Sequence, residues 1–475
     1  MMILLLIGTV PAAAFAQETP VTQGTETMGD VALAVDTVWV IMAAMLVLFM
    51  QAGFAMLEVG FSRMKNVGSV VAKILAMMGI GLVVFWAVGF AFTFSDGGGL
   101  QSLIGTQGFF LAAPDDTYAG LAWTAVPLSA KFLFQVAFAL VSLAIVWGTM
   151  LERTKFAVYC IFAVVFAGLI YPIIGHWVWG GGWLSTFGMQ DFAGSTVVHL
   201  SGAMAALAGT LLLGPRIGKY DDQGNPQTIP GHNMPLAVLG VIILWIGWWG
   251  FNPGSTMSAV GASFADIALT TNLAAGAGVL GAMVMSYLYT RNLDVGMMGN
   301  GAIAALVAIT ASCAFVAPWA AIIIGFLAGV IMYSVLVFVD RIGVDDPLGA
   351  IAAHGMGGIW GTLSTGLFAT PALVESTGIG SPGLFYGGGL AQLGVQALGI
   401  ICCGGFVFLT SYAVFAVLKA TIGLRVKPEH ELNGLDISEH GVYGYSEQLI
   451  ATDYQNGSSG SLRIPEGRTA EGTVS

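Results

Sequence analysis

The sequence predicts an all-α polytopic membrane protein, and its composition and patterning carry that prediction. Of its 475 residues, 56% are hydrophobic and only 9% are charged. A soluble globular protein carries about 25% charged residues, so this chain cannot cover a water-facing surface. Apolar runs of about 20 residues, long enough to cross a ~30 Å hydrocarbon core, recur along the chain. The 67 glycines fit close helix packing in such a bundle.

We expect one membrane domain at 38–420 with eleven transmembrane helices. The predicted spans are 38–61, 68–94, 122–150, 155–175, 192–213, 235–251, 262–290, 298–317, 319–340, 347–370 and 388–419.

Basic residues follow every second predicted span. They are Arg63, Lys65, Arg153, Lys155, Arg216, Lys219, Arg291, Arg341, Arg425 and Lys427. The alternate loops contain no Lys or Arg, so the positive-inside rule places the N-terminus outside and the C-terminus inside. The exception is Lys131, which we expect near the outer end of its helix, extending its amine toward the outer surface.

The two termini differ from the membrane domain in composition. Residues 1–16 are apolar and end in Ala-Phe-Ala, which predicts a signal peptide; because they lack a basic start, a short interfacial anchor is the alternative. Residues 17–37 read as a polar exported stub and residues 421–475 as a cytoplasmic tail. We therefore expect a multi-pass protein of the cell (inner) membrane. The net charge of −11 comes largely from loops and tail, and nothing in it indicates a nucleic-acid partner.

Two segments of the chain repeat one pattern. Asp191 precedes His199 by eight residues, and Asp346 precedes His354 by the same spacing. At about 1.5 Å per residue each histidine lies about 12 Å deep, near the membrane centre. The two spans run in opposite directions, which predicts a five-plus-five inverted repeat with an eleventh helix added. Two midplane histidines at symmetric positions favour one shared functional site.

Purely structural roles for these residues stay open as alternatives. A lone buried histidine is often a satisfied core residue, and aspartate is a favoured helix N-cap, which suits Asp191 and Asp346. A metal site would need a third ligand, and the sequence has no further His or Cys positioned to supply it. The four cysteines all fall in apolar runs, so we expect no disulfide.

Aromatic residues gather where the outer mouth is expected. Trp179, Phe138, Phe251 and Ser255 come from different helices and could meet there. An aromatic face attracts a cation without a fixed countercharge, and a hydroxyl accepts a hydrogen bond from it. The competing reading of each tryptophan is a membrane-interface belt. A potassium-type filter is excluded because no TVGYG-like stretch occurs.

Several stretches resemble the ammonium transporter (Amt/Mep/Rh) family. They are "DFAGSTVVHLSGAMAALAGTLLLGPR", "YPIIGHWVWGGGW", "GWWGFNPGS", "DDPLGAIAAHGMGG" and "GLRVKPEHELNGLDISEHG". The resemblance covers about 38–445 in order. It implies an eleven-span homotrimer with a pore in each subunit, and a tail segment that communicates between subunits and with a PII-type signal protein.

The resemblance also implies roles for individual residues. Trp179 and Ser255, with Phe138 beside them, would recruit ammonium; Phe138 and Phe251 would form the gate. His199, His354 and Trp248 would line the pore, and Asp191 would support the site. Two charged residues depart from the family pattern, Glu58 and Lys131.

The predicted function is transmembrane ammonium transport. Ammonium would lose its proton in an apolar constriction, and ammonia would pass with or without that proton. Methylammonium is a further expected substrate. An ammonium sensor that signals through its tail is the alternative. We expect no cofactor and no enzymatic activity, because HExxH and G-x-S-x-G motifs are absent and two histidines with an aspartate lack a nucleophile.

Overall fold

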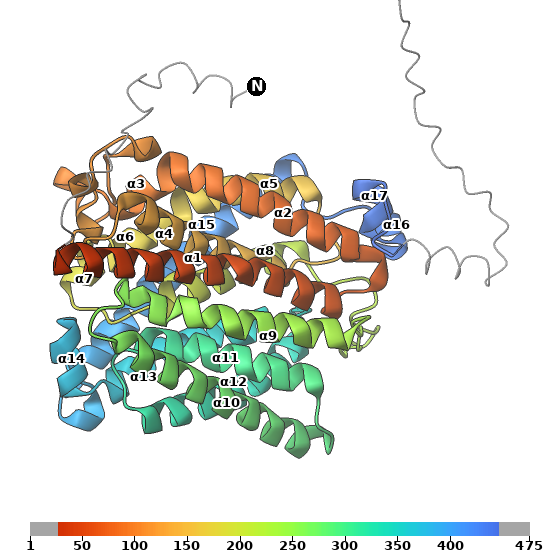
Figure 1. Cartoon of the computed structure of the whole chain (residues 1–475). Helices are drawn as coiled ribbons and strands as arrows, with labels where there is room; N and C mark the ends of the chain where they lie inside the picture. The colour runs from red at the N-terminus through yellow and green to blue at the C-terminus, as the bar shows by residue number, and fades with distance from the viewer. Residues whose placement is uncertain (1–26, 446–475) are drawn as a thin grey trace, which may run out of the picture.

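The computed structural model describes residues 27–445, so the predicted signal peptide and the end of the tail lie outside the described residues. Within that range the chain is helical, with two isolated β-bridges and no named strand. Ten helical stretches of the same range are long and apolar enough to cross a membrane. They lie side by side in one bundle (Figure 1). The predicted all-helical membrane fold is therefore confirmed.

The bundle is built from α1 (Met28–Phe61), α2 (Val67–Val84), α4 (Leu128–Gly148), α5 (Phe156–Val165), α6 (Tyr171–Val178), α8 (Ser201–Leu213), α9 (Met234–Phe251), α10 (Ser263–Thr290), α11 (Val295–Ser312), α12 (Pro318–Arg341), α13 (Gly357–Phe368) and α15 (Ala391–Thr421). Four π-helical segments extend these helices: η5 (Phe85–Gly89), η10 (Phe166–Ile170), η11 (Ser195–Leu200) and η13 (Ile351–Met356).

Short helices occupy the two ends of the bundle. They are α3 (Phe90–Phe94), α7 (Trp183–Thr186), α14 (Pro371–Thr377), α16 (Pro428–Asn433), α17 (Leu435–His440), and the 3₁₀ turns η4 (Met64–Asn66), η6 (Gly98–Leu100), η7 (Phe109–Leu111), η8 (Asp115–Thr117), η9 (Ala119–Leu121), η12 (Pro253–Thr256) and η14 (Leu384–Tyr386). We call the end that carries α16 and α17 the tail end, and the opposite end, with α7 and α14, the loop end (Figure 1).

Two of the differences between the predicted spans and the helices lie at α1 and at 347–370. α1 begins at Met28 rather than at 38, because Thr27 and Asp30 form a capping box that starts the helix earlier. The predicted span 347–370 corresponds to η13 and α13, which run together from Ile351 to Phe368. This stretch is not among the ten long helices and is largely enclosed by its neighbours.

Glycine lets α1 and α9 pack with their backbones in contact. A Cβ on Gly240 would lie 2.3 Å from the Leu57 amide nitrogen, and one on Gly60 would lie 2.3 Å from the Ala237 amide nitrogen. No real Cβ approaches backbone that closely, so only glycine fits. Without a hydrophobic driving force between helices in lipid, such close contact is a main source of association. This bears out the packing role expected from the glycine content.

A network of five charged side chains joins the helix connections at the tail end. The Glu152 carboxylate accepts hydrogen bonds from Arg63 Nε at 2.8 Å and Arg216 Nη1 at 3.2 Å. The Asp345 carboxylate accepts from Arg216 Nε at 2.9 Å and lies 3.8 Å from Arg153. Burial acts to raise the pKa of Glu152, but the Arg216 and Arg63 guanidiniums outweigh it and the net pKa is lowered. The network is therefore ionised near neutral pH.

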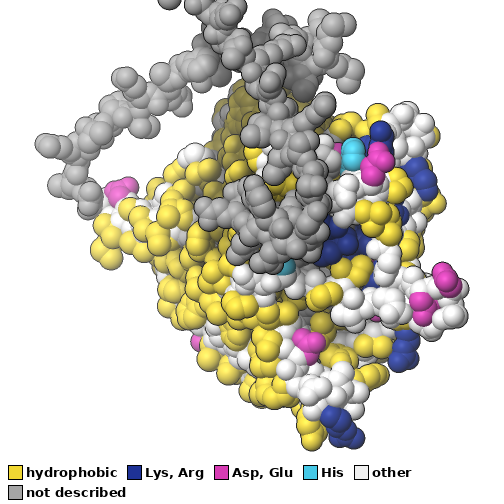
Figure 2. Space-filling model, turned by 90° about the vertical axis from the view of Figure 1, so that its right-hand side faces the viewer, with side chains coloured by type: hydrophobic (Ala, Val, Ile, Leu, Met, Phe, Trp, Pro, Cys, Tyr) yellow, Lys and Arg dark blue, Asp and Glu magenta, His cyan; other side chains and the backbone are white. Residues whose placement is uncertain are grey.

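The tail docks on this end through carboxylates that meet backbone N–H groups. Asp436 accepts from the Gly68 and Ser69 amides at 3.0 and 2.9 Å, which caps the start of α2. Glu431 accepts from the Ile217 amide at 2.7 Å. Lys and Arg side chains gather on this end of the molecule, within a largely hydrophobic surface (Figure 2).

Candidate functional site

The two repeated segments fold alike. His199 and His354 each lie in a π-helical segment, η11 and η13. Each segment follows a glycine with positive φ, 113° at Gly194 and 74° at Gly349, where residues with a Cβ would be strained. π-helical turns are rare and occur mostly at functional sites. The repeat read from the sequence thus recurs in backbone geometry.

Both aspartates of the repeat cap their segments. The Asp191 carboxylate accepts hydrogen bonds from the amides of Gly194, Thr196 and Val197 at 3.1, 3.0 and 2.9 Å. The Asp346 carboxylate accepts from the amides of residues 350 and 351 at 2.9 and 2.8 Å. These bonds satisfy N–H groups that a helix start leaves free. Capping was one of the two readings left open by the sequence.

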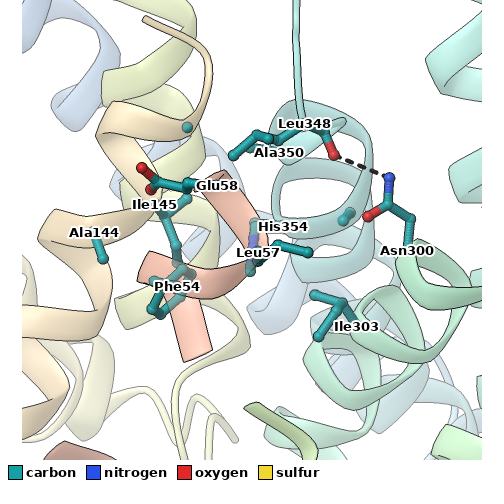
Figure 3. Close-up of a pocket in the computed structure, with 12 residues that line it drawn as sticks. Phe54, Leu57, Glu58, Ala144, Ile145, Asn300, Ile303, Leu348, Ala350 and His354 are labelled. Atoms are coloured by element: carbon teal, nitrogen blue, oxygen red, sulfur yellow. Dashed lines mark hydrogen bonds between the residues drawn. The ribbon is translucent and has the colours of Figure 1, made fainter. Parts of the chain in front are cut away.

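The histidines meet inside the bundle. His199 Nδ1 and His354 Nδ1 are 3.2 Å apart, and their ring centroids are 5.3 Å apart. His199 is fully buried, whereas His354 keeps 4% of its surface exposed and lines a small cavity (Figure 3). Between two neutral imidazoles one Nδ1 must donate and the other accept. One ring then presents Nε2 as an acceptor and the other presents Nε2–H as a donor.

Trp248 packs against the His199 ring of this pair. Its ring stacks on His199 with centroids 5.4 Å apart and an interplanar angle of 16°. Its Nε1 donates to Thr310 Oγ1 at 3.0 Å, which satisfies the buried indole N–H and fixes the ring. The His199 Nε2 atom has no hydrogen-bond partner among the described residues. An imidazole nitrogen is thus left available in an otherwise apolar enclosure.

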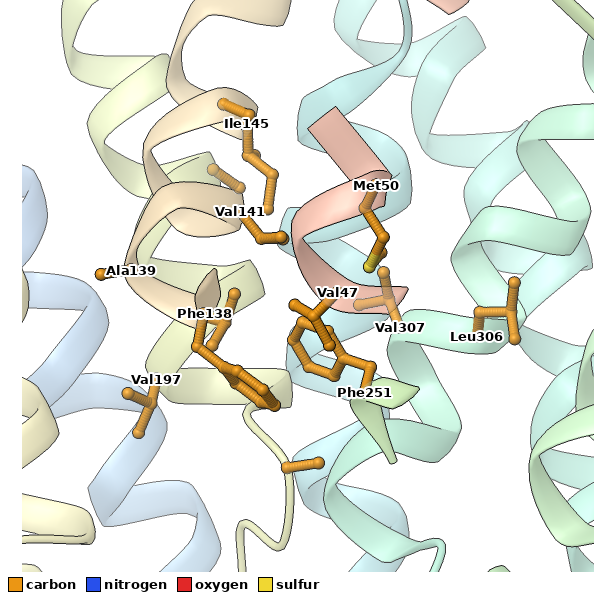
Figure 4. Close-up of a cluster of buried hydrophobic side chains, with 14 of the residues drawn as sticks. Val47, Met50, Phe138, Ala139, Val141, Ile145, Val197, Phe251, Leu306 and Val307 are labelled. Carbon is orange, nitrogen blue, oxygen red and sulfur yellow. The ribbon is translucent and has the colours of Figure 1, made fainter. Parts of the chain in front are cut away.

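Two phenylalanines close the approach to the histidines. The rings of Phe138, from α4, and Phe251, from α9, stack with centroids 4.1 Å apart, and Phe251 lies 5.4 Å from the His199 ring. Apolar side chains such as Val47 and Val197 surround them (Figure 4). The stacked rings make this point an apolar constriction beside the histidines.

Trp179 and Ser255 lie next to this aromatic pair toward the loop end. The Trp179 ring is 6.2 Å from Phe138, and its Nε1 donates to the Asp191 carbonyl oxygen at 2.8 Å. Ser255 Oγ donates to the Phe251 carbonyl oxygen at 2.8 Å. A hydroxyl whose proton is engaged this way keeps its lone pairs free to accept from a cation. These contacts bring together Trp179 at the end of α6, Phe138 of α4, and Phe251 and Ser255 of α9 and η12.

Lys131 pairs with the loop that precedes α4. Its side chain is 1% exposed, and its Nζ donates to the Asp115 carboxylate at 2.7 and 2.9 Å. The amine extends into this loop but is buried rather than exposed to solvent. A loop carboxylate folds over it, which a span-by-span reading could not anticipate because Asp115 lies in the irregular loop before α4.

Sequence reasoning missed Lys73, although it singled out Glu58. The two residues form an ion pair inside the bundle, between α1 and α2, and each side chain is 1% exposed. The signal was present, since opposite charges occur within two adjacent predicted spans and a lone charge there is costly. Among residues 27–445, no group of three or more His, Cys, Asp or Glu side chains could hold a metal ion.

Comparison with known proteins decides the family. The sequence profile of the Ammonium Transporter Family matches residues 38–445. The chain belongs to the ammonium transporter family. Ammonium transporter Amt2 of Archaeoglobus fulgidus is 46% identical over 425 residues, 87% of this chain and 88% of the relative. The ammonium transporter of Bacillus subtilis is 35% identical over 421 residues, covering 87% of this chain and 99% of its own length.

Solved structures of ammonium transporter relatives share the fold. A sensor Amt protein superposes with a TM-score of 0.80 at 36% identity, covering 87% of this chain and all of that chain. Mep2 of Saccharomyces cerevisiae gives 0.76 at 27% identity, covering 83% of this chain and 88% of that one. The family predicted from the motifs is thus confirmed. The protein is a multi-pass membrane protein of this transporter family.

Proposed function

We propose that the chain recruits ammonium at its loop end, removes a proton, and conducts ammonia past the histidine pair. The observation that carries this is a continuous column of rings, Trp179, Phe138, Phe251, His199 and His354. Neighbouring centroids are 6.2, 4.1, 5.4 and 5.3 Å apart. The column passes from a rim suited to a cation, through an apolar constriction, to paired nitrogen atoms.

Recruitment uses the aromatic rim. Trp179 and Phe138 offer ring faces to ammonium, a contact of ~0.5–2 kcal/mol depending on desolvation. Ser255 contributes a lone pair, because its own proton is donated to Phe251. Ammonium has four N–H donors and matches such acceptors better than a spherical ion does. Methylammonium keeps three of them and is the expected second substrate.

The constriction explains why a proton is removed. A bare cation between the stacked Phe138 and Phe251 rings would lose its water at a cost of several kcal/mol. Neutral ammonia avoids that cost. Opening the stack costs only about 0.5–1.5 kcal/mol beyond the area exposed, so ring rotation is an accessible motion.

The histidine pair gives the proton a route. A proton arriving at the acceptor Nε2 of one ring is matched by transfer across the Nδ1 contact and release from Nε2 of the other. The contact of 3.2 Å is at the long limit of a hydrogen bond, so the two rings must approach for transfer. Transport then moves charge with each ammonia. If the proton instead returns to the side from which the ammonium came, ammonia passes alone.

The setting follows from family membership and charge. The tail end carries the basic residues and would face the cytoplasm, with the N-terminus outside. We propose a homotrimer in the cell (inner) membrane, with 1–16 removed as a signal peptide. The tail is the proposed contact for a PII-type signal protein.

The histidines provide the direct test. His199→Ala and His354→Ala, expressed in a host that lacks its own ammonium transporters, are expected to abolish growth on low ammonium while surface expression stays normal. Loss of expression would return the pair to a structural role. Ammonium pulses on a solid-supported membrane then separate the two modes, since a current requires that the proton follow.

A sensor that signals through its tail remains the second candidate. Two observations favour it: Asp436 and Glu431 dock the tail on the helix connections at the tail end, and one protein of similar structure is a sensor Amt protein. Ammonium flux by the purified chain in liposomes distinguishes the two. A pure sensor would give none.

A further inference from the structure

An ion pair lies between the histidine pair and the tail end. Glu58 is in the last turn of α1, four residues before Ser62, which caps that helix. Its Oε2 contacts Lys73 Nζ from α2, and both side chains are 1% exposed. Two buried charges cost free energy that a surface pair does not, so the pair calls for a reason beyond stability.

A small cavity joins this pair to the site. It has a volume of about 20 Å³, above the roughly 10–15 Å³ that one water molecule needs. Glu58 and His354 both line it, from α1 and η13, so the carboxylate and the imidazole border the same space (Figure 3). The remaining lining side chains are mainly apolar, including Phe54 and Ile145.

One oxygen of the Glu58 carboxylate can still accept a hydrogen bond at this cavity. Glu58 Oε1 is buried and has no hydrogen-bond partner among the described residues, whereas Oε2 is engaged by Lys73. Apart from Glu58 and His354, the one polar side chain among the described residues that line the cavity is Asn300, which donates its amide to the Leu348 carbonyl oxygen at 2.9 Å. A buried carboxylate oxygen without a donor is costly, and one small molecule in the cavity would supply it.

The charged and titratable groups around Glu58 are few. Lys73 faces it from α2, and the Lys73 ammonium lies 5.8 Å from the centre of the Tyr159 ring on α5. α4 presents only Ala144, Ile145 and Gly148 to the cavity. Among the described residues that line the cavity, His354 is thus the one group that can pass a proton to Glu58.

We propose that Glu58 is the proton acceptor on the tail side of the histidine pair, reached through one water or ammonia molecule in this cavity. The proposal rests on the proposed function, in its proton-following form. The His354 N–H bond breaks and an N–H or O–H bond forms on the cavity molecule, which gives one of its own protons to Glu58 Oε1. The imidazolium becomes a neutral imidazole and the carboxylate becomes a carboxyl. The unit positive charge moves to the Glu58–Lys73 pair.

Lys73 keeps this proton from staying on Glu58. Before the transfer, the pair is neutral overall and the Glu58 carboxylate attracts the proton. After it, the pair carries a net positive charge, and the Lys73 ammonium favours the ionised carboxylate, so the proton is readily released again. Glu58 is a positioning and relay residue in this scheme and does not contact the substrate at the outer rim.

Currents from purified protein on a solid-supported membrane test the proposal. Glu58→Gln keeps the shape but removes the proton acceptor, and the ammonium-evoked current per folded protein is expected to fall at least tenfold. Glu58→Asp keeps a carboxylate and is expected to recover part of the current. The matched control is Glu152→Gln, which removes another buried, cation-paired carboxylate at the tail end and is expected to stay within about twofold of the unmodified protein.

The double variant Glu58→Gln/Lys73→Gln leaves no unpaired buried charge and covers the case in which the single variant fails to fold. A low current in the double variant supports the relay. A double variant that recovers the full current shows that the carboxylate only neutralises Lys73, and it overturns the proposal, as does a full current in Glu58→Gln. An unmodified protein with ammonia flux but no current overturns it together with the proton-following form, while ammonia transport itself stands.

Discussion

Replacing Asp191 by alanine tests the capping reasoning most directly. The carboxylate satisfies three buried amides, at 3.1, 3.0 and 2.9 Å, whereas Asp346 satisfies two, at 2.9 and 2.8 Å. At about 1 kcal/mol for each bond lost, Asp191→Ala costs about 3 kcal/mol and Asp346→Ala about 2. The Trp179 indole bonds the backbone carbonyl of Asp191, so this contact survives the substitution.

Asparagine gives an intermediate case. Asp191 Oδ2 accepts from Thr196 and Val197, and Oδ1 accepts from Gly194. In an Asp191→Asn variant the side-chain amide oxygen can replace Oδ2, but the NH₂ group then faces the Gly194 amide, a donor against a donor. We expect a loss of about 1–2 kcal/mol.

The assay is thermal unfolding of the purified protein in detergent, followed by size exclusion. The expected order of midpoints is unmodified, Asp191→Asn, Asp346→Ala, Asp191→Ala, with the middle two close together. Equal midpoints for Asp191→Ala and the unmodified protein would refute the assignment of the carboxylate to these amides. Transport is compared per folded molecule, so that a loss of stability is not mistaken for a loss of function.

Three further substitutions probe the gate, the packing and the charge network. Phe251→Ala removes half of the stack and is expected to admit potassium, measured as flux in liposomes; continued exclusion of potassium would contradict the gate. Gly240→Ala drives a Cβ to 2.3 Å from the Leu57 amide and is expected to cost more than about 1–3 kcal/mol, seen as a lower unfolding midpoint. Gly79→Ala, with open space around it, is its control and is expected to be neutral. Glu152→Gln is expected to lower the midpoint at about pH 7 and to lower it less at about pH 3, because a carboxylate with a lowered folded-state pKa stabilises fully above its ordinary value of 4.5 and loses that contribution as pH falls through the folded-state pKa. An equal lowering of the unfolding midpoint at both pH values would show that the negative charge of Glu152 does not stabilise the folded protein.

The sequence predicted what depends on periodic patterning. Span lengths follow from hydrophobicity, and the eight-residue spacing of Asp191 to His199 and Asp346 to His354 placed both histidines at one depth. Family motifs then supplied Trp179 as a rim residue. These features are local in the chain, or repeat in it, so a single sequence contains them.

Contacts made by irregular segments could not be predicted. Lys131 was expected to extend its amine toward the outer surface, and the sequence did not show that Asp115 of the loop before α4 covers it. The start of α1 depended on one capping box, at Thr27 and Asp30. The π-helical turns were also missed, since nothing in the hydrophobic pattern distinguishes them from α-helix.

The ionisable groups near the histidine pair find hydrogen-bond partners in three different ways. The differences indicate where protons and ammonia would bind. Asp191 is satisfied by backbone amides and Lys73 by a carboxylate. His199 and His354 share one bond between them. Among these ionisable groups, the described residues leave His199 Nε2 and Glu58 Oε1 without a hydrogen-bond partner, one on each side of the shared bond. A fold that satisfies its other buried charges with fixed partners leaves these two to be satisfied by molecules that move, and the path between them is the one along which protons and ammonia would travel.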